Sequence, residues 1–220
     1  MKIFIFYIRF TGAFFVGLVI SMDSIYNGGI TREQFLFYEM RSTCQLIVQG
    51  YSKEETLKKI LDENLYQFPT EKTIKTIAQG CFRRIDALQN DFLIREMAEG
   101  ASDVAKQINL YAMMKYNKIV WDFMVTVIGE KYRTFDLSFS KKDINVFLQR
   151  LREQVEGISS WSDATMQKIG QVLMKCLVEC GYVENVKSTE LLNVNLVPEL
   201  EEGIRQNGDE VIFPAFNFFG

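Results

Sequence analysis

The 220-residue sequence contains no histidine, only three prolines and only four cysteines. Without histidine, the chain cannot form a Ser-His-Asp or Cys-His catalytic site, nor a zinc site with a histidine ligand. It also lacks the side chain that most often acts as a general base near neutral pH. Carboxylate or lysine chemistry remains open, but no motif points to it. We therefore expect no catalytic residues, metal ligands, cofactor or small-molecule substrate.

The cysteines do not show the spacing of a metal site. None of them forms a C-x-x-C motif, and Cys176 and Cys180 lie one turn apart on one predicted helix. Cys81 occupies an apolar position of a helical pattern, where a free cysteine acts as a small hydrophobic side chain. We expect all four, Cys44 included, to be reduced and mostly buried.

Scarce proline and long stretches of 3.6-residue periodicity favour an all-α, mainly helical fold. A hydrophobic content of 48% is enough for a sizeable core. We expect two helix-turn-helix-like units around a central helical core, in which residues 102–131 form one long or two consecutive helices. The second unit is a candidate winged helix, because Tyr182 and Val183 precede a polar run compatible with a short β-hairpin.

This reading divides the chain into four parts: an apolar N-terminal extension at 1–24, a helix-turn-helix-like domain at 25–100, a winged-helix-like domain at 101–190, and an acidic, aromatic tail at 191–220 that packs on the core. Near the start of the second part, Thr31 and Gln34 resemble a capping box for a helix running to Gln49.

The N-terminal extension differs in composition from the rest of the chain. Its apolar run from Phe10 to Ile20 is too short to span a bilayer as a helix, so a membrane partner is not expected. No small-x-small cleavage site follows the run. Two explanations stay open: synthesis begins at Met22, or the extension is an apolar N-terminal element or anchor.

Two 16-residue stretches, starting at Thr70 and Ser162, repeat one helical pattern. When Thr73 is superposed on Thr165, four apolar positions coincide on one helix face: Ile74 with Met166, Ile77 with Ile169, Cys81 with Leu173, and Ile85 with Leu177. Thr70 and Ser162 are the expected N-caps. Each stretch follows another predicted helix, so both are typical of the second helix of a helix-turn-helix.

The opposite faces of these two helices carry polar and basic residues and, on this reading, no acid. They supply the candidate DNA-binding residues Lys72, Lys75, Thr76, Gln79, Arg83, Gln167, Lys168, Gln171 and Lys175. Such side chains reach phosphates and base edges from a groove-bound helix, although most polar faces are solvated surface. Arg84 lies at the edge of the apolar stripe and is expected to pair with an acid inside the fold.

The formal net charge is −3, but the charge is unevenly distributed. Residues 23–182 contain 21 basic and 21 acidic side chains, whereas residues 183–220 contain 2 basic and 7 acidic ones. A neutral body with two basic helix faces predicts modest, salt-sensitive DNA affinity. Because the first helix has Lys72, Lys75 and Arg83, we expect it to make the primary contact. The second helix is then a secondary contact or a docking surface.

Five segments, taken in order, resemble the BrxA family of bacterial BREX phage-defence systems. They are FLFYEMR, GYSKEET, ENLYQFPTEKTIKTI, AKQINLYAMMKYNKIVWDFM and SSWSDATMQKIGQVLMKCLVECGYV, within residues 25–200. The specificity lies in their order and spacing, since no single motif is diagnostic. The resemblance implies a helical, cytoplasmic, DNA-binding accessory protein without known catalytic activity, which works beside other BREX components.

These observations predict a non-enzymatic, sequence-tolerant binder of double-stranded DNA that helps assemble or target a defence complex. The alternative is a protein interaction adaptor of the same complex, whose helix-turn-helix surfaces dock partners and do not bind DNA. The near-zero charge of the body suits the adaptor, and salt-dependent binding of duplex DNA distinguishes the two.

Overall fold

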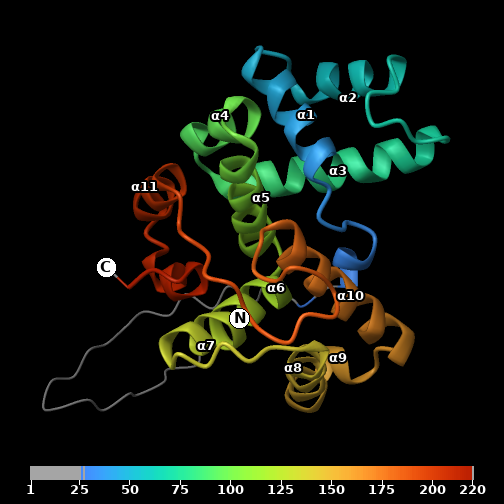
Figure 1. Ribbon diagram of the computed structural model, residues 1–220. Helices are drawn as coiled ribbons and strands as arrows, with labels where there is room; N and C mark the ends of the chain where they lie inside the picture. The colour runs from blue at the N-terminus through green and yellow to red at the C-terminus, as the bar shows by residue number, and fades with distance from the viewer. Residues whose placement is uncertain (1–25, 27, 220) are drawn as a thin grey trace, which may run out of the picture.

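The computed structural model describes residue 26 and residues 28–219 (Figure 1). Over these residues the chain forms eleven α-helices and no regular strand, apart from one isolated antiparallel bridge between Ser138 and Glu190. The prediction of an all-α fold is therefore confirmed. The predicted extension at 1–24 lies outside the described residues, as does Asn27.

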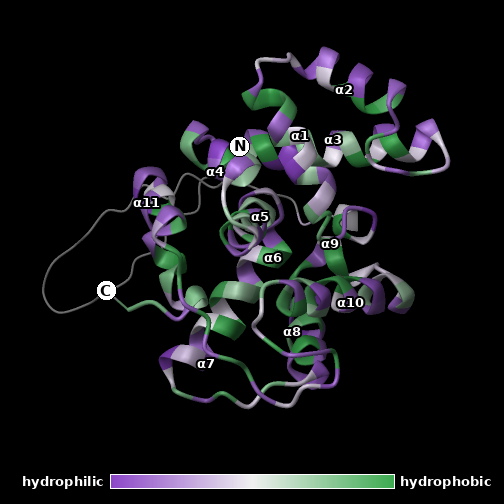
Figure 2. Cartoon of the chain, turned by 45° about the horizontal axis from the view of Figure 1, so that its top comes forward, coloured by the Kyte–Doolittle hydropathy of each residue, from purple (hydrophilic) through white to green (hydrophobic). Residues whose placement is uncertain are grey.

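The first half of the chain packs around one buried helix. Its elements are the 3₁₀ turn η1 (Gly28–Thr31), α1 (Phe37–Val48), α2 (Lys53–Asp62), α3 (Glu71–Leu88), α4 (Asp91–Glu99) and α5 (Ser102–Tyr116). Every residue from 107 to 114 in α5 is buried, so this helix has no solvent face over two turns. In Figure 2, α5 accordingly lies at the centre of the molecule with other helices around it.

The second half continues from α5 through a break at Asn117. The elements that follow are α6 (Lys118–Phe123), the π-helical turn η2 (Met124–Ile128), α7 (Gly129–Arg133), α8 (Lys141–Gln154), α9 (Glu156–Ser159), α10 (Asp163–Glu179), α11 (Pro198–Asn207) and the 3₁₀ turn η3 (Glu210–Phe216). The Asn117 backbone is extended, with φ −125° and ψ 112°, and its side chain caps α6 by accepting from the amide of Ile119 at 3.0 Å. Residues 102–131 thus form consecutive helices.

The predicted helix start at Thr31 is wrong. Thr31 ends η1, where its hydroxyl donates to the Gly28 carbonyl at 2.8 Å, and α1 begins only at Phe37. Leu36 before it has a left-handed conformation with φ 48°. The capping-box pattern fails because residues 33–35 make long-range contacts that replace a local helix.

Arg84 of α3 holds this non-helical segment in place. Its side chain is 1% exposed, and its guanidinium donates to the backbone carbonyls of Glu33, Gln34 and Phe35. Arg84 therefore satisfies backbone acceptors and does not form the acid pair expected from sequence. Burial lowers the pKa of its guanidinium, while the surrounding carbonyls supply the acceptors that an enclosed cation needs.

The predicted β-hairpin after α10 is present only as an irregular wing, residues 182–192. Leu192 donates to the Tyr182 carbonyl at 2.8 Å, and Leu191 donates to the Leu137 carbonyl at 2.7 Å. Between these anchors, the Asn185 side chain accepts from the Lys187 amide at 2.9 Å. Such side-chain turns compete with a regular ladder, so the wing forms without strands.

The C-terminal tail folds back onto the helices. Helix α11 packs on α4 and α5, while η3 packs on η2 and α7. Phe213 and Phe216 are buried, whereas Phe219 is 54% exposed. None of the helices in the described part of the chain is both long enough and apolar enough to cross a membrane.

Candidate nucleic-acid interface

The two sequence-matched stretches form α3 and α10, and both begin with the same cap geometry. Thr70 accepts from the amide of Thr73 at 3.3 Å, and Ser162 accepts from the amide of Thr165 at 3.2 Å. The paired hydroxyls are also in contact, at 2.9 Å and 3.0 Å respectively. The predicted caps are therefore confirmed, and each satisfies one helix-end amide.

The matched apolar positions are buried in both helices. The buried set comprises Ile74, Ile77, Cys81 and Ile85 in α3, and Met166, Ile169, Leu173 and Leu177 in α10. Preceding helices cover these faces, since α2 packs on α3 and α8 packs on α10. In each unit the second helix is thus left with one solvent-facing side, although the short helix α9 lies between α8 and α10.

On α3, the structure pairs two of the three predicted cations with acids. Lys75 Nζ lies 3.1 Å from Glu71 Oε2 on the preceding turn. Arg83 donates to the carboxylate of Glu33, whose side chain is only 5% exposed. The Arg83 guanidinium also lies over the ring of Tyr116, 5.6 Å from its centroid. Of these cations, only Lys72 has no carboxylate within 4 Å among the described residues.

The α3 face also contains acids that the sequence reading did not assign to it. At 100° per residue, Glu71 and Asp86 fall on the same side of the helix as Lys75 and Gln79. Asp86 is exposed and lies 2.5 Å from Lys53 of α2. The remaining predicted residue, Thr76, donates its hydroxyl to the Lys72 carbonyl at 2.9 Å. The face is consequently close to neutral.

The α10 face keeps its cations available. Lys168 is partly buried and Lys175 is exposed, and neither has a carboxylate within 4 Å in the part of the chain that the structure describes. Gln167 and Gln171 are exposed one turn apart on the same side. With 100° per residue, all four predicted residues of α10 lie within one stripe.

A groove runs beside this stripe, between α8 and α10, as two adjoining hollows. The first, of about 470 Å³, is lined by Asn145, Leu148, Gln149, Arg152, Glu153, Asp163, Met166 and Gln167. The second, of about 300 Å³, is lined by Lys141, Ile144, Asn145, Gln167, Gly170, Gln171, Met174 and Val186. We call them together the α8–α10 groove. Asn145 and Gln167 line both hollows.

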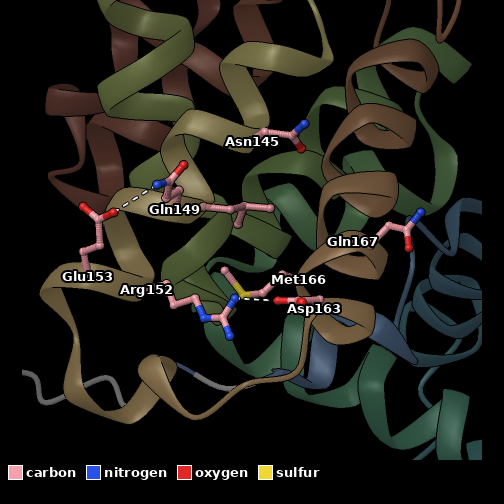
Figure 3. Close-up of a pocket in the computed structure, with 8 residues that line it drawn as sticks. Asn145, Gln149, Arg152, Glu153, Asp163, Met166 and Gln167 are labelled. Carbon is pink, nitrogen blue, oxygen red and sulfur yellow. Dashed lines mark hydrogen bonds and ion pairs between the residues drawn. The ribbon is translucent and has the colours of Figure 1, made fainter.

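The polar groups of the first hollow fall into two kinds (Figure 3). Gln149 donates to Glu153 at 3.1 Å, and Arg152 lies 2.6 Å from Asp163 across the two helices. By contrast, Asn145 and Gln167 carry no such bond in Figure 3. Their amide groups are therefore free to bond to a molecule in the groove.

The second hollow ends at the wing, which brings in residues that the sequence reading missed. Val186 of the wing lines the hollow and is 47% exposed, and Lys187 follows it. Lys141, in the first turn of α8, lines the same hollow. Lys141 has no ion pair within the described residues. Lys187 lines a separate hollow of the wing, together with Glu184 and Glu190. The place of Lys141 and Val186 beside α10 depends on the tertiary fold, which helix periodicity cannot reveal.

The cysteines agree with the expectation of free, mostly buried thiols. The four cysteines are unpaired, and three of them are buried. Over the described residues, no group of three or more Cys, Asp or Glu side chains is placed to bind a metal ion. Asp122 accepts from Tyr26 at 2.5 Å and from Lys118 at 3.0 Å, so it lies within a local hydrogen-bond network.

Comparison with known proteins connects this arrangement to a family. The BrxA family model matches residues 24–208, which is most of the chain. The chain belongs to the BrxA family. The similarity begins next to Met22 and includes both helix-turn-helix-like units and α11. None of the residues of the extension before position 24 takes part in the match.

Named relatives agree with the BrxA assignment. The chain is 33% identical over 194 residues to a BREX protein BrxA of Bacillus cereus (strain H3081.97), covering 86% of this chain and 94% of the relative. It is 24% identical over 192 residues to a BREX protein BrxA of Escherichia coli O9:H4 (strain HS), covering 87% and 90%. Neither name refers to an enzyme.

A solved structure shares the fold. The crystal structure of an uncharacterized protein from Magnetospirillum magneticum superposes with a TM-score of 0.75 at 22% identity, covering 87% of this chain and 97% of the other. At that identity the match concerns architecture alone. The helical arrangement described above is therefore found in an experimentally determined structure.

Proposed function

We propose that this BrxA-family chain is a non-enzymatic BREX component that binds double-stranded DNA, with the winged unit of α8, α10 and residues 182–192 as its primary contact. The family match and the BREX names of the relatives support the assignment of this chain to a BREX system. The arrangement of charge around α10 supports the choice of ligand and of surface.

One observation carries the proposal: three lysines without ion pairs in the described part of the chain lie on or beside the exposed side of α10. Lys168 and Lys175 belong to that helix, and Lys141 of α8 lines the adjoining hollow. An unpaired lysine loses no internal partner when it contacts a phosphate, and it releases condensed counterions from the duplex. A helix with a neighbouring wing is a common geometry for groove binding.

On this proposal the α3 unit is the secondary DNA contact. The number of basic residues in each helix had predicted the opposite, with α3 as the primary contact. Glu33 already neutralises Arg83, so its contact with a phosphate adds less attraction than the contact of an unpaired cation. Contact of Lys75 competes with the weaker, exposed pair to Glu71. Among the described residues of this face, only Lys72 and Gln79 can contact DNA without competition from an ion pair or a backbone hydrogen bond. This near-neutral face supports docking of a protein component as its alternative role.

The proposal is tested by measuring binding of a labelled duplex over a salt series. Wild-type affinity should fall as salt rises. The slope of log K against log salt is proportional to the number of phosphates that the protein contacts. Lys168→Ala with Lys175→Ala should lower affinity and reduce the slope of log K against log salt by about 2, because each contact contributes about 0.9. Lys72→Ala with Lys75→Ala should have the smaller effect.

Lys142→Ala is the matched control. Lys142 is exposed and lies on α8 beside Lys141, but it lines a different hollow, on the side facing η2 and α7. Its removal should leave both affinity and slope unchanged. If the wild-type chain shows no salt-dependent binding at low ionic strength, DNA binding is refuted and the adaptor function is favoured. If the α3 pair changes the slope more than the α10 pair, the assignment of the primary surface is wrong.

A further inference from the structure

We infer that the winged unit, if it binds DNA as proposed, recognises A·T base pairs in the major groove through the carboxamides of Gln167 and Gln171. This inference rests on the proposed function and deepens it, since phosphate contacts alone carry no sequence information. The proposal concerns the second hollow of the α8–α10 groove.

The carboxamides of the two glutamines are available to a ligand. Gln167 and Gln171 are exposed, lie one turn apart on α10, and make no hydrogen bond within the described residues. Gln149, in the adjoining hollow, shows the contrast, because its amide is occupied by Glu153 at 3.1 Å. A free carboxamide presents one donor and one acceptor side by side. Adenine presents the complementary pair in the major groove, an N7 acceptor and an N6 donor.

Apolar side chains lie beside those amides. The hollow that contains Gln167 and Gln171 is also lined by Ile144, Met174 and Val186; Ile144 and Met174 are themselves buried, so the exposed apolar surface is that of Val186 on the wing, which is 47% exposed. Thymine is the one DNA base with a methyl group in the major groove, and apolar side chains contact it. The hollow thus offers a surface for both members of an A·T pair.

Few side chains in the second hollow favour other bases. Guanine is usually bound in the major groove by arginine or lysine, and cytosine by a carboxylate that accepts from N4. Among the described residues, the lining of this hollow contains no arginine and no carboxylate. Arg152 and Asp163 in the first hollow bind each other at 2.6 Å, so both are engaged. Lys141 of α8 is the one cation in the described lining of the second hollow, and it lacks the planar fork with which arginine makes a bidentate contact.

The test begins with selection from a pool of duplexes that share one length and contain a randomised centre. Wild-type protein should enrich A·T pairs at fixed positions, with a preference of about tenfold over duplexes carrying G·C there. Gln167→Ala with Gln171→Ala should abolish this preference while leaving affinity for the G·C duplex unchanged. Alanine favours the helix at exposed positions, so the variant should fold normally. Gln149→Ala is the matched control and should keep the preference.

Base analogues identify the atoms that are recognised. Substitution of 7-deazaadenine removes the N7 acceptor but keeps base pairing, and it should remove most of the preference. Deoxyuridine removes the thymine methyl group and should reduce it in part. Inosine paired with cytosine resembles A·T in the minor groove but guanine in the major groove, so it should bind like G·C.

The outcomes separate the two proposals. Duplex binding without A·T enrichment, a preference that survives Gln167→Ala with Gln171→Ala, or a preference insensitive to 7-deazaadenine each overturns the inference but leaves DNA binding intact. Inosine behaving like adenine also overturns it, since the reading is then in the minor groove. Absence of salt-dependent binding to every duplex overturns the proposed function and this inference together.

Discussion

Replacement of Arg83 by alanine should destabilise the protein more than it weakens DNA binding. Glu33 is 5% exposed at its side chain, and its Oε1 accepts from Arg83. Its Oε2 is buried and has no hydrogen-bond partner among the described residues. Gly80 lies beside it, so close that a Cβ there would lie 2.9 Å from Glu33 Cδ. Arg83→Ala therefore leaves a carboxylate in a confined space without its counterion.

The size of the effect follows from the exposure of the two partners. Removing one partner of a buried ion pair costs about 3–5 kcal/mol, because the other charge stays buried. The Arg83 side chain is 45% exposed, so solvent screens the pair and water can approach Glu33 once the guanidinium is gone. We therefore expect a loss of about 2 kcal/mol, equivalent to a melting temperature lower by roughly 4–8 °C for a chain of this size.

Urea denaturation followed by far-UV circular dichroism measures this loss. A double-mutant cycle with Glu33→Gln should give a coupling free energy of about 1–2 kcal/mol, because the neutral amide leaves no charge unpaired when the guanidinium is removed. Duplex affinity of Arg83→Ala, measured well below its melting temperature, should stay within about twofold of wild type. Normal stability combined with a large loss of affinity would refute this reasoning and restore Arg83 as a DNA contact.

Two further predictions concern α3, α10 and the buried thiols. Ser162→Ala should lower the free energy of unfolding by about 1 kcal/mol, and Thr70→Ala should lower it by a similar amount. Both residues cap their helices with the same geometry. Unequal losses in urea denaturation would contradict the structural match between the two helices. Burial raises the pKa of Cys81 to about 11, so the native thiol stays protonated at pH values where the unfolded thiol ionises. Its contribution to stability should be complete below its ordinary pKa near 9 and should be lost as pH rises towards 11; Cys81→Ala should flatten this part of the pH–stability curve.

Local signals predict where several of the helices begin. Ser52, Thr70, Ser140 and Ser162 each precede an apolar periodic stretch, and each caps a helix in the structure. Thr31 follows the same local rule and fails. Its neighbours at 33–35 are bonded by Arg84, about fifty positions away, and this long-range clamp overrides the local preference.

The candidate site was predictable in its residue types but not in its electrostatics. Gln167, Lys168, Gln171 and Lys175 lie on one exposed stripe, as the periodicity of α10 predicts. The ion pair between Lys75 and Glu71 has the i, i+4 spacing, so it could be predicted from the sequence. The pair between Arg83 and Glu33 spans fifty residues and required the fold.

The two helices show why one sequence pattern need not mean one function. Matching apolar positions determine which side of α3 and α10 is buried, and matching caps determine where each helix begins. Neither determines what lies at the edge of the exposed side. At α3 that edge is the segment before α1, whose Glu33 neutralises Arg83. At α10 it is α8, which adds Lys141 to the unpaired lysines already there. The helix with fewer basic residues in its own sequence therefore has the larger available positive charge, because the neighbouring segments and not the helix decide how much charge a phosphate can meet.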